Sequence, residues 1–368
     1  MACLGSIKTF LLYPWSLTRR QYFKKKYFFF SWSDALLFLF NFHQVQREEY
    51  LLLPNFLCQE TVLYWQKKCR VIYYQINDDL SVNKDSYFSQ IKLYRPRVIL
   101  NFSFVGFELT DSEWTNLKSL INEKTIIIED YAHRLFADLP LKQTTNHYFI
   151  DIIRKHCSLL GAHLLNFNGR VAGVKKINHY KLACIFYRFW QNRLFDLAYI
   201  FSAPSLYQWG FKFFLKLNNL IGEPVAPTTG TWFSFLAYNF LNLKKIRKNY
   251  NEILLSYNEK IALLPDIYIK KLNSTALIES GIATYYPLLV SKAIREQLLT
   301  FLETDGIFAF QIWNWEEKTG RKELNRELHE SLIVFPLSVL ITKSDIDYIF
   351  EKMKTFFANL SYVENKNE

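Results

Sequence analysis

The sequence predicts an α/β protein in which helices flank a mostly parallel sheet and a smaller α+β region follows. Short, continuous apolar runs recur through the first half of the chain, as in strands that are buried on both faces. Helix-like segments separate these runs, which favours right-handed crossovers between parallel strands. Beyond about residue 173 helical patterns dominate, and strand-like runs return only near the C-terminus.

The first half contains five strand-like runs, at residues 50–54, 70–76, 97–102, 125–130 and 147–153. The helices expected between them cover residues 59–68, 84–94 and 111–122. Asp111 or Ser112 is the expected N-cap of the last helix. The apolar stretch 27–42 is interrupted by polar residues and falls short of the ~20 residues of a membrane span. It therefore predicts a strand end followed by a buried helix.

The second half opens with an aromatic-rich helical region over residues 180–217, a break at 222–230 and a helical stretch over 232–263. Strands are expected at residues 285–287, 307–313 and 331–337, with a helix at 292–303 and a closing amphipathic helix from Ser344. These patterns divide the chain into a basic N-terminal segment (1–27), a large α/β domain (28–175) and a helical connection with a small C-terminal domain (176–368).

Composition narrows the class of protein. The chain has 368 residues, half of them hydrophobic, which is enough for a large core. Part of the net charge of +11 lies between Arg19 and Lys26, a run that attracts phosphates or an anionic membrane face but is more often a solvated surface. No nucleic-acid-binding motif accompanies it. The five cysteines form no CxxC pair, which favours a reduced cytoplasmic setting, and the seven histidines lack metal-ligand spacing.

Two residues of opposite charge follow neighbouring strands. Asp130 ends the run 125–130, and Lys155 follows the run 147–153. Ligands of open parallel sheets bind at the carboxyl ends of the strands, where both side chains would lie. A carboxylate there can keep a pyridinium nitrogen protonated, and a lysine can hold the cofactor as an imine. The pair thus favours a pyridoxal-phosphate site, although a buried acid at a strand end more often caps a loop.

The start of the first helix is the third candidate element. Ser31, Trp32, Ser33 and Asp34 open it, and free N–H groups at a helix N-terminus bind phosphate. Ordinary capping by Ser31 or Ser33 explains the same residues. Asp34 favours the cap, because its charge would repel a phosphate.

Several short sequence motifs, taken in their order along the chain, point to a protein family. They are residues 31–36 (Ser-Trp-Ser-Asp-Ala-Leu), 52–58 (Leu-Leu-Pro-Asn-Phe-Leu-Cys), 104–106 (Phe-Val-Gly), 128–133 (Ile-Glu-Asp-Tyr-Ala-His), 153–155 (Ile-Arg-Lys) with 161–162 (Gly-Ala), 306–308 (Gly-Ile-Phe) with Trp313, and 335–337 (Phe-Pro-Leu) before 344–346 (Ser-Asp-Ile). Over roughly residues 28–358, this order resembles the DegT/DnrJ/EryC1/StrS family of pyridoxal-phosphate-dependent sugar aminotransferases. The resemblance implies a fold-type I transferase with a seven-stranded sheet.

The resemblance also implies roles for individual residues. Lys155 would hold the cofactor and move the proton, and Asp130 would keep the ring nitrogen protonated. His133 would lie near the ring and its phenolic oxygen. Ser33 and the backbone of Asp34 would hold the phosphate.

Cys58 lies where the family often has an aromatic or small residue over the ring. The sequence departs from the pattern at Trp32 and Asp34, which replace small residues at the phosphate turn. It also departs at residues 150–152, where the family usually has a serine.

The function implied is transfer of an amino group, from an amino acid such as glutamate, to a nucleotide-linked keto-sugar by a cytoplasmic homodimer. A catalytically degenerate member of the fold, serving as a binding or scaffold subunit in surface-polysaccharide synthesis, is the first alternative. A basic peripheral membrane protein that uses residues 19–26 is the second.

Overall fold

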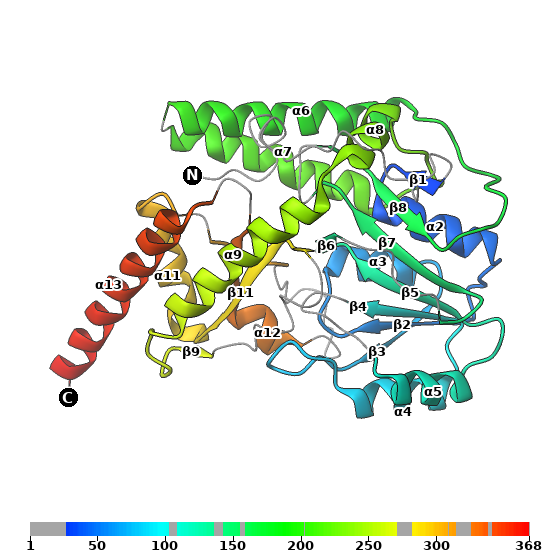
Figure 1. The fold of residues 1–368 in the computed structure, drawn as a ribbon, viewed down its shortest axis with the longest axis horizontal. Helices are drawn as coiled ribbons and strands as arrows, with labels where there is room; N and C mark the ends of the chain where they lie inside the picture. Colours follow the sequence, from blue (N-terminus) through cyan, green and yellow to red (C-terminus); the bar gives the residue numbers. More distant parts are fainter. Residues whose placement is uncertain are drawn as a thin grey trace.

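The centre of the molecule is a seven-stranded sheet with the strand order β1-β8-β7-β5-β4-β2-β3 (Figure 1). The computed structural model describes residues 27–102, 109–135, 143–154, 159–201, 203–270, 282–307, 309–313, 325–337 and 341–367. The strands of this sheet are β1 (Phe28–Phe29), β2 (Tyr50–Pro54), β3 (Arg70–Tyr74), β4 (Val98–Phe102), β5 (Ile126–Tyr131), β7 (His147–Ile152) and β8 (Ala162–Leu165).

Five adjacent strands, from β7 through β5, β4 and β2 to β3, run parallel. All five were predicted, because their continuous apolar runs are buried on both faces in the structure. Leu52, Ile99 and Ile128, for example, are fully buried in the centre of β2, β4 and β5. The sequence did not predict β8, which lies between β7 and the edge strand β1 and runs antiparallel to both.

The helices of the first half connect the parallel strands. They are α2 (Trp32–Phe42), α3 (Gln59–Gln66), α4 (Lys84–Tyr94) and α5 (Asp111–Leu120). The predicted strand end and buried helix over residues 27–42 are confirmed as β1 and α2. The predicted cap of α5 is wrong: Thr110 caps it, and its side chain and that of Glu113 form a reciprocal capping box.

A helical hairpin follows the sheet and lies along the top of the molecule in Figure 1. It consists of α6 (His179–Ile200) and α7 (Pro204–Gly222). The sequence predicted one helical region here. Pro204 occupies the first turn of α7, where a proline starts a helix at no cost in hydrogen bonds. The next predicted helical stretch is likewise divided, into α8 (Trp232–Phe240) and α9 (Leu243–Ile261).

The C-terminal part has a three-stranded antiparallel sheet, in the order β12-β11-β9. Its elements are β9 (Ile269–Lys270), β11 (Tyr285–Val290), α11 (Lys292–Thr304), α12 (Arg326–Ser331), β12 (Leu332–Pro336) and α13 (Lys343–Asn367). The predicted α+β character is confirmed. Two short strands, β6 (Arg134–Leu135) and β10 (Ile282–Ala283), pair with each other and link this part to the end of β5.

The strand predicted at residues 307–313 is wrong for the residues described there. Phe310 makes only an isolated bridge to Val334 of β12. Trp313 has a φ of 63°, in the left-handed region that an extended strand does not visit. The chain therefore turns at Trp313, and this turn brings the indole ring to the end of the large sheet.

His43 makes the stability of the fold depend on pH. Its Nε2 lies 2.9 Å from the Tyr148 hydroxyl, and burial, with Arg97 nearby, lowers the pKa of His43 to about 4. The unfolded chain takes up a proton on this residue near pH 6.5, so the folded state loses stability as the pH falls from about 6.5 to about 4.

We expect His43→Gln to remove this loss. Between pH 7 and pH 4.5 the free energy of unfolding, measured with urea, should fall about 2 kcal/mol less in the variant than in the wild type. Parallel pH profiles for the two proteins would contradict this assignment.

Candidate functional site

Asp130 lies at the carboxyl edge of the sheet, as predicted. It pairs with Ile150 of the adjacent strand β7, so β5 and β7 end side by side. Its side chain is 4% exposed, and its Oδ1 accepts a hydrogen bond of 2.9 Å from the Ala132 N–H. Lys155 follows the end of β7 by three residues and lies outside the described residues. The register thus brings the strand that precedes Lys155 next to the strand that carries Asp130.

His133 is buried in a group of aromatic rings beyond the end of β5. The centres of the Phe102, Tyr285 and Trp313 rings lie 6.4, 5.7 and 5.4 Å from that of the His133 ring. The His133 carbonyl accepts hydrogen bonds from both the N–H and the hydroxyl of Thr284. His133 therefore joins the large sheet to the C-terminal part, and apolar surfaces surround its ring.

The start of α2 contains a buried ion pair that the sequence did not predict. The Asp34 carboxylate is fully buried, and its Oδ2 lies 2.8 Å from Nζ of Lys181, on α6. The other oxygen, Oδ1, accepts a 3.0 Å hydrogen bond from the Thr228 N–H. Ser31 caps the helix by accepting from the Asp34 N–H, and its hydroxyl donates to the Asp34 carboxylate. The N-terminus of α2 thus carries an anion that the chain itself supplies.

The electrostatics of this pair follow from its burial. Loss of water raises the pKa of the Asp34 carboxyl, and Lys181 opposes that rise. The Lys181 ammonium also lies 4.8 Å from the centre of the Phe30 ring. Since Lys181 balances the charge of Asp34, a second anion at the helix N-terminus would meet a neutral pair. Ser33 is buried in the same turn, and its role as a phosphate ligand stays a prediction.

Cys58 lies just beyond the carboxyl end of β2 and precedes α3. Its thiol donates to Oε2 of Glu60 at 2.7 Å. Burial raises the pKa of the Cys58 thiol to about 11, and the Glu60 carboxylate adds to the rise. The thiol is therefore protonated at neutral pH and is a poor nucleophile. Its predicted place over the cofactor ring stays a prediction.

A second buried acid near the same edge was missed by the sequence reasoning. Asp151 of β7 is fully buried and pairs with His163 of β8 across the two strands. The Tyr238 hydroxyl donates to the Asp151 carboxylate, and the Tyr238 and His163 rings pack edge to face with their centres 5.5 Å apart. The visible signal was an acid inside the apolar run 147–153. Its partners could not be read from the sequence, because they come from β8 and α8.

One open cavity lies at the same edge of the sheet as Asp130, beyond the carboxyl ends of β2 and β3. Its volume is about 660 Å³, and it is lined by Asn55, Gln75, Ile76, Asn77, Asp78, Asp79, Lys270 and Asn325. Asn325 fixes one wall by donating from its N–H to the Asn55 carbonyl and from its side-chain amide to that of Ile76. Amides, carboxylates and one lysine thus face a concave surface where ligands of parallel sheets bind.

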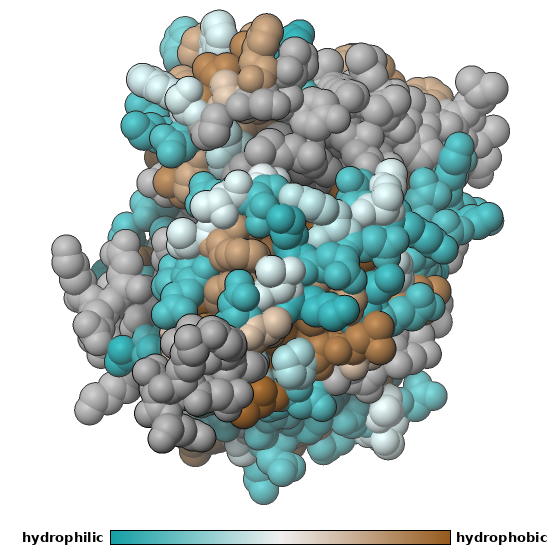
Figure 2. Space-filling view, turned by 90° about the vertical axis from the view of Figure 1, so that its left-hand side faces the viewer, coloured by the Kyte–Doolittle hydropathy of each residue, from teal (hydrophilic) through white to brown (hydrophobic). Residues whose placement is uncertain are grey.

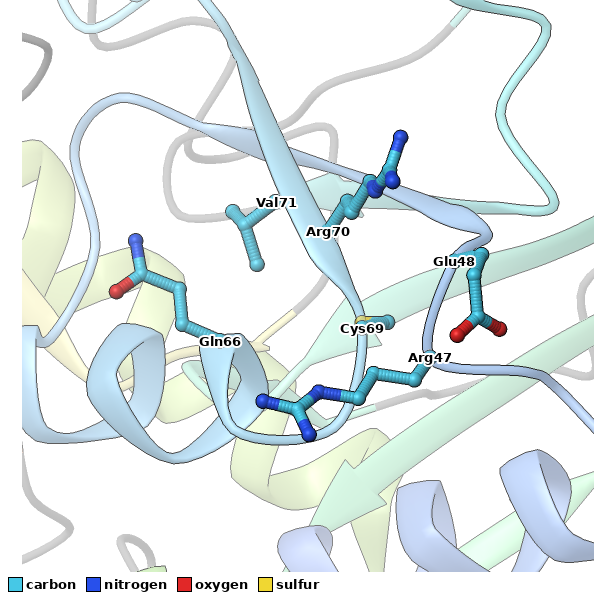
Figure 3. A pocket seen from close by; sticks show the side chains of 6 residues that line it. All are labelled: Arg47, Glu48, Gln66, Cys69, Arg70 and Val71. Atoms are coloured by element: carbon cyan, nitrogen blue, oxygen red, sulfur yellow. The ribbon is translucent and has the colours of Figure 1, made fainter.

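Another cavity, of about 400 Å³, lies at the opposite edge. Figure 3 shows Arg47 and Glu48 on the segment that leads into β2, and Arg70 and Val71 at the start of β3. Gln66 and Cys69 complete its lining. It is therefore placed at the amino ends of the strands, away from Asp130.

No protein-family model matches the chain, and no curated protein is similar to it in sequence. Solved structures, in contrast, are similar over nearly its whole length. A Streptococcus pneumoniae protein assigned as a sugar aminotransferase, in its apo form, matches with a TM-score of 0.61 at 12% identity. The match covers 99% of this chain and 98% of that one.

Two further structures extend the comparison. Helicobacter pylori PseC, an aminotransferase involved in the biosynthesis of pseudoaminic acid, has a TM-score of 0.57 at 14% identity over 90% of this chain and 86% of its own. The Escherichia coli GDP-4-keto-6-deoxy-D-mannose-3-dehydratase with bound hydrated pyridoxal phosphate has a TM-score of 0.55 at 13% identity over 92% of both chains. The predicted fold class is thereby confirmed: the chain has the fold of these proteins, one of which holds pyridoxal phosphate.

Proposed function

We propose that this protein is a pyridoxal-phosphate-dependent aminotransferase, with an amino acid such as glutamate as donor and a nucleotide-linked keto-sugar as acceptor. The observation that carries the proposal is the position of Asp130, buried at the end of β5 beside the strand that Lys155 follows. The sugar-nucleotide chemistry is taken from the structural neighbours, one of which acts on a GDP-linked keto-sugar according to its name.

The residues at this edge suit the two ends of the cofactor differently. Asp130 suits the ring nitrogen, because a buried carboxylate favours the protonated, positively charged form of that nitrogen. The N–H groups of Trp32 and Ser33, at the start of α2, have no partner within the helix and can receive the phosphate together with the Ser33 hydroxyl, whereas the Asp34 N–H already donates to Ser31. Lys181 offsets the charge of Asp34, which removes most of the repulsion expected at this turn.

When bound, pyridoxal phosphate supplies an electron sink for the amino-group transfer. Lys155 would attach the cofactor and carry the proton between the reacting carbons. Asp130 would keep the ring nitrogen charged, and the rings around His133 would exclude water from that side. Cys58 would lie over the ring only as a packing group, since its thiol is protonated.

The substrate class is supported by the cavity beyond β2 and β3. Its wall of amides and carboxylates offers both donors and acceptors, which suits the hydroxyl groups of a sugar. The resemblance also leads us to propose a cytoplasmic homodimer and a division of the chain near residue 175.

A non-catalytic member of the same fold, acting as a binding or scaffold subunit in surface-polysaccharide synthesis, is the second candidate. The specific observation in its favour is the Asp34 carboxylate, which is itself an anion held at the N-terminus of α2. A protein that has replaced its phosphate ligand by its own carboxylate would bind the cofactor poorly.

Chemical labelling distinguishes the two candidates. We expect the purified protein, after addition of pyridoxal phosphate, to absorb visible light, and borohydride reduction followed by peptide mapping to place the label on Lys155. Lys155→Ala should lose the absorbance, whereas Lys175→Ala, a matched control on the same chain, should keep it.

The other outcomes are equally informative. A folded protein that acquires no absorbance at saturating cofactor would establish the non-catalytic alternative. Labelling of Lys142 or Lys175 would refute the assignment of Lys155 while leaving the cofactor in place.

A further inference from the structure

The outer face of α6 is apolar, which is unusual for a helix at the surface of a protein. Its exposed large side chains recur at helical spacing along one stripe: Leu182, Phe186, Phe189, Trp190 and Leu197 are 38–56% exposed. The buried side of the same helix is mixed: Lys181, Arg188, Gln191 and Asn192 lie there beside Cys184, Phe195 and Ala198. A surface helix of a soluble protein normally turns its large apolar side chains toward the core and its polar side chains toward water. The outer stripe is therefore a surface suited to being covered.

The neighbouring helix α7 extends this surface. Trp209 is 58% exposed, and Phe201, where α6 ends, is 68% exposed. Phe211 and Leu215 are also exposed, but at about 100° per residue they lie on another side of α7. The two helices lie side by side along the top of the molecule in Figure 1. Figure 2 views the hairpin from its end, at the top, where hydrophobic and hydrophilic residues alternate over a small area. We call the apolar stripe of α6, together with Trp209 of α7, the hairpin face.

Basic residues are set among these rings. Arg193 lies 5.5 Å from the centre of the Phe189 ring, Lys212 lies 5.2 Å from that of Trp209, and Lys216 lies 5.0 Å from that of Tyr187. The two helices contain a single acidic residue, Asp196. Aromatic rings with an adjacent cation suit the boundary between lipid headgroups and acyl chains, where the ring is buried and the cation meets a phosphate.

We propose that the hairpin face docks the protein on an anionic membrane surface, a property that is independent of the proposed catalytic function. The helices would lie on the membrane, because no helix in the described part of the chain is long and apolar enough to cross one. A second copy of this chain fits the face less well. A two-fold interface sets the same patch against itself, so Arg193, Lys212 and Lys216 of both copies would enter one interface in which these helices offer only Asp196 as an opposite charge.

Vesicle sedimentation of the full-length protein tests the proposal. We expect binding to phosphatidylcholine vesicles that contain phosphatidylglycerol, little binding to phosphatidylcholine alone, and weaker binding as salt is raised. Reversing three charges, in Arg193→Glu/Lys212→Glu/Lys216→Glu, should weaken the binding more than about tenfold.

The matched control is Lys92→Glu/Lys118→Glu/Lys124→Glu, which makes the same change of charge at exposed positions on and beside α4 and α5. These helices lie at the opposite end of the molecule in Figure 1. This variant should bind within about twofold of the wild type, because charges more than a Debye length from the membrane are screened.

The rings are tested separately. Trp190→Ser/Trp209→Ser keeps every charge, removes two exposed indoles and should also lose most of the binding. Its melting temperature should match that of the wild type, since both side chains are about half exposed.

Three results would overturn the proposal. Equal binding of the two triple variants would place the contact elsewhere, for example on the basic residues 19–26. Equal binding to neutral and anionic vesicles would show that the basic residues do not select an anionic membrane surface. A dimer in sedimentation velocity that the hairpin triple variant dissociates would show that a second copy covers this face.

Discussion

Asp34→Ala should destabilise the protein by about 3–5 kcal/mol, because it leaves the Lys181 ammonium buried without its carboxylate. The side chain of Lys181 is 3% exposed and that of Asp34 is 0% exposed, so water cannot replace the lost partner. The same change also removes the acceptor of the Thr228 N–H and of the Ser31 hydroxyl. The free energy of unfolding in urea measures the effect.

A double variant separates the broken ion pair from other losses. Asp34→Ala/Lys181→Met replaces the pair by apolar side chains, and we expect it to recover most of the stability, because an apolar replacement of a buried ion pair is often neutral or stabilising. The Lys181→Met single variant completes the comparison. If the double variant loses as much free energy of unfolding as the two single variants together, the two residues do not depend on each other.

The same double variant provides a stable background for measuring cofactor affinity. If the Asp34 carboxylate is directed at Lys181 and not at the phosphate, the affinity of the apo-protein for pyridoxal phosphate should stay within a few-fold of the wild type. Binding that is tighter by about tenfold or more would show that Asp34 repels the phosphate, and would favour the non-catalytic candidate.

The parallel part of the fold could be predicted because its signals are local. Each buried strand is a continuous apolar run, and the helices α2, α4 and α5 begin at a capping side chain, that of Ser31, Asn83 and Thr110. Among the helices that the structure describes in the first half, only α3 begins without one, after Cys58. Antiparallel β8 has no such signal in its four residues. The turn at Trp313 also escaped prediction, because a positive φ is rare for a tryptophan and follows from packing against distant rings.

Only the site residues that lie at the ends of predicted strands could be placed from the sequence. Asp130 was placed by its position after an apolar run, and the structure has it at that edge. The partners of Asp34, in contrast, are Lys181 and Thr228, which lie 147 and 194 residues further along the chain. Contacts over such separations follow from the packing of α6 and of the segment before α8 onto α2, which no local pattern encodes.

Asp130→Asn should leave the fold intact and reduce amino-group transfer by more than about 100-fold, the scale on which groups that control a proton act. The amide is isosteric, and its oxygen can still accept from the Ala132 N–H, so the loop after β5 keeps its hydrogen bond. The amide carries no charge, however, and cannot keep the ring nitrogen of the cofactor protonated. Unfolding curves should therefore overlay while the turnover number falls.

The control is Asp111→Asn, the same change at the exposed first turn of α5, which should leave turnover unaltered. Cofactor binding, measured in parallel, should persist in Asp130→Asn, because the contacts of the phosphate and of Lys155 are untouched. A drop in melting temperature with unchanged turnover would assign Asp130 a structural role in place of a catalytic one. Loss of turnover without loss of stability or of cofactor binding is the result expected of a charge that faces the cofactor ring.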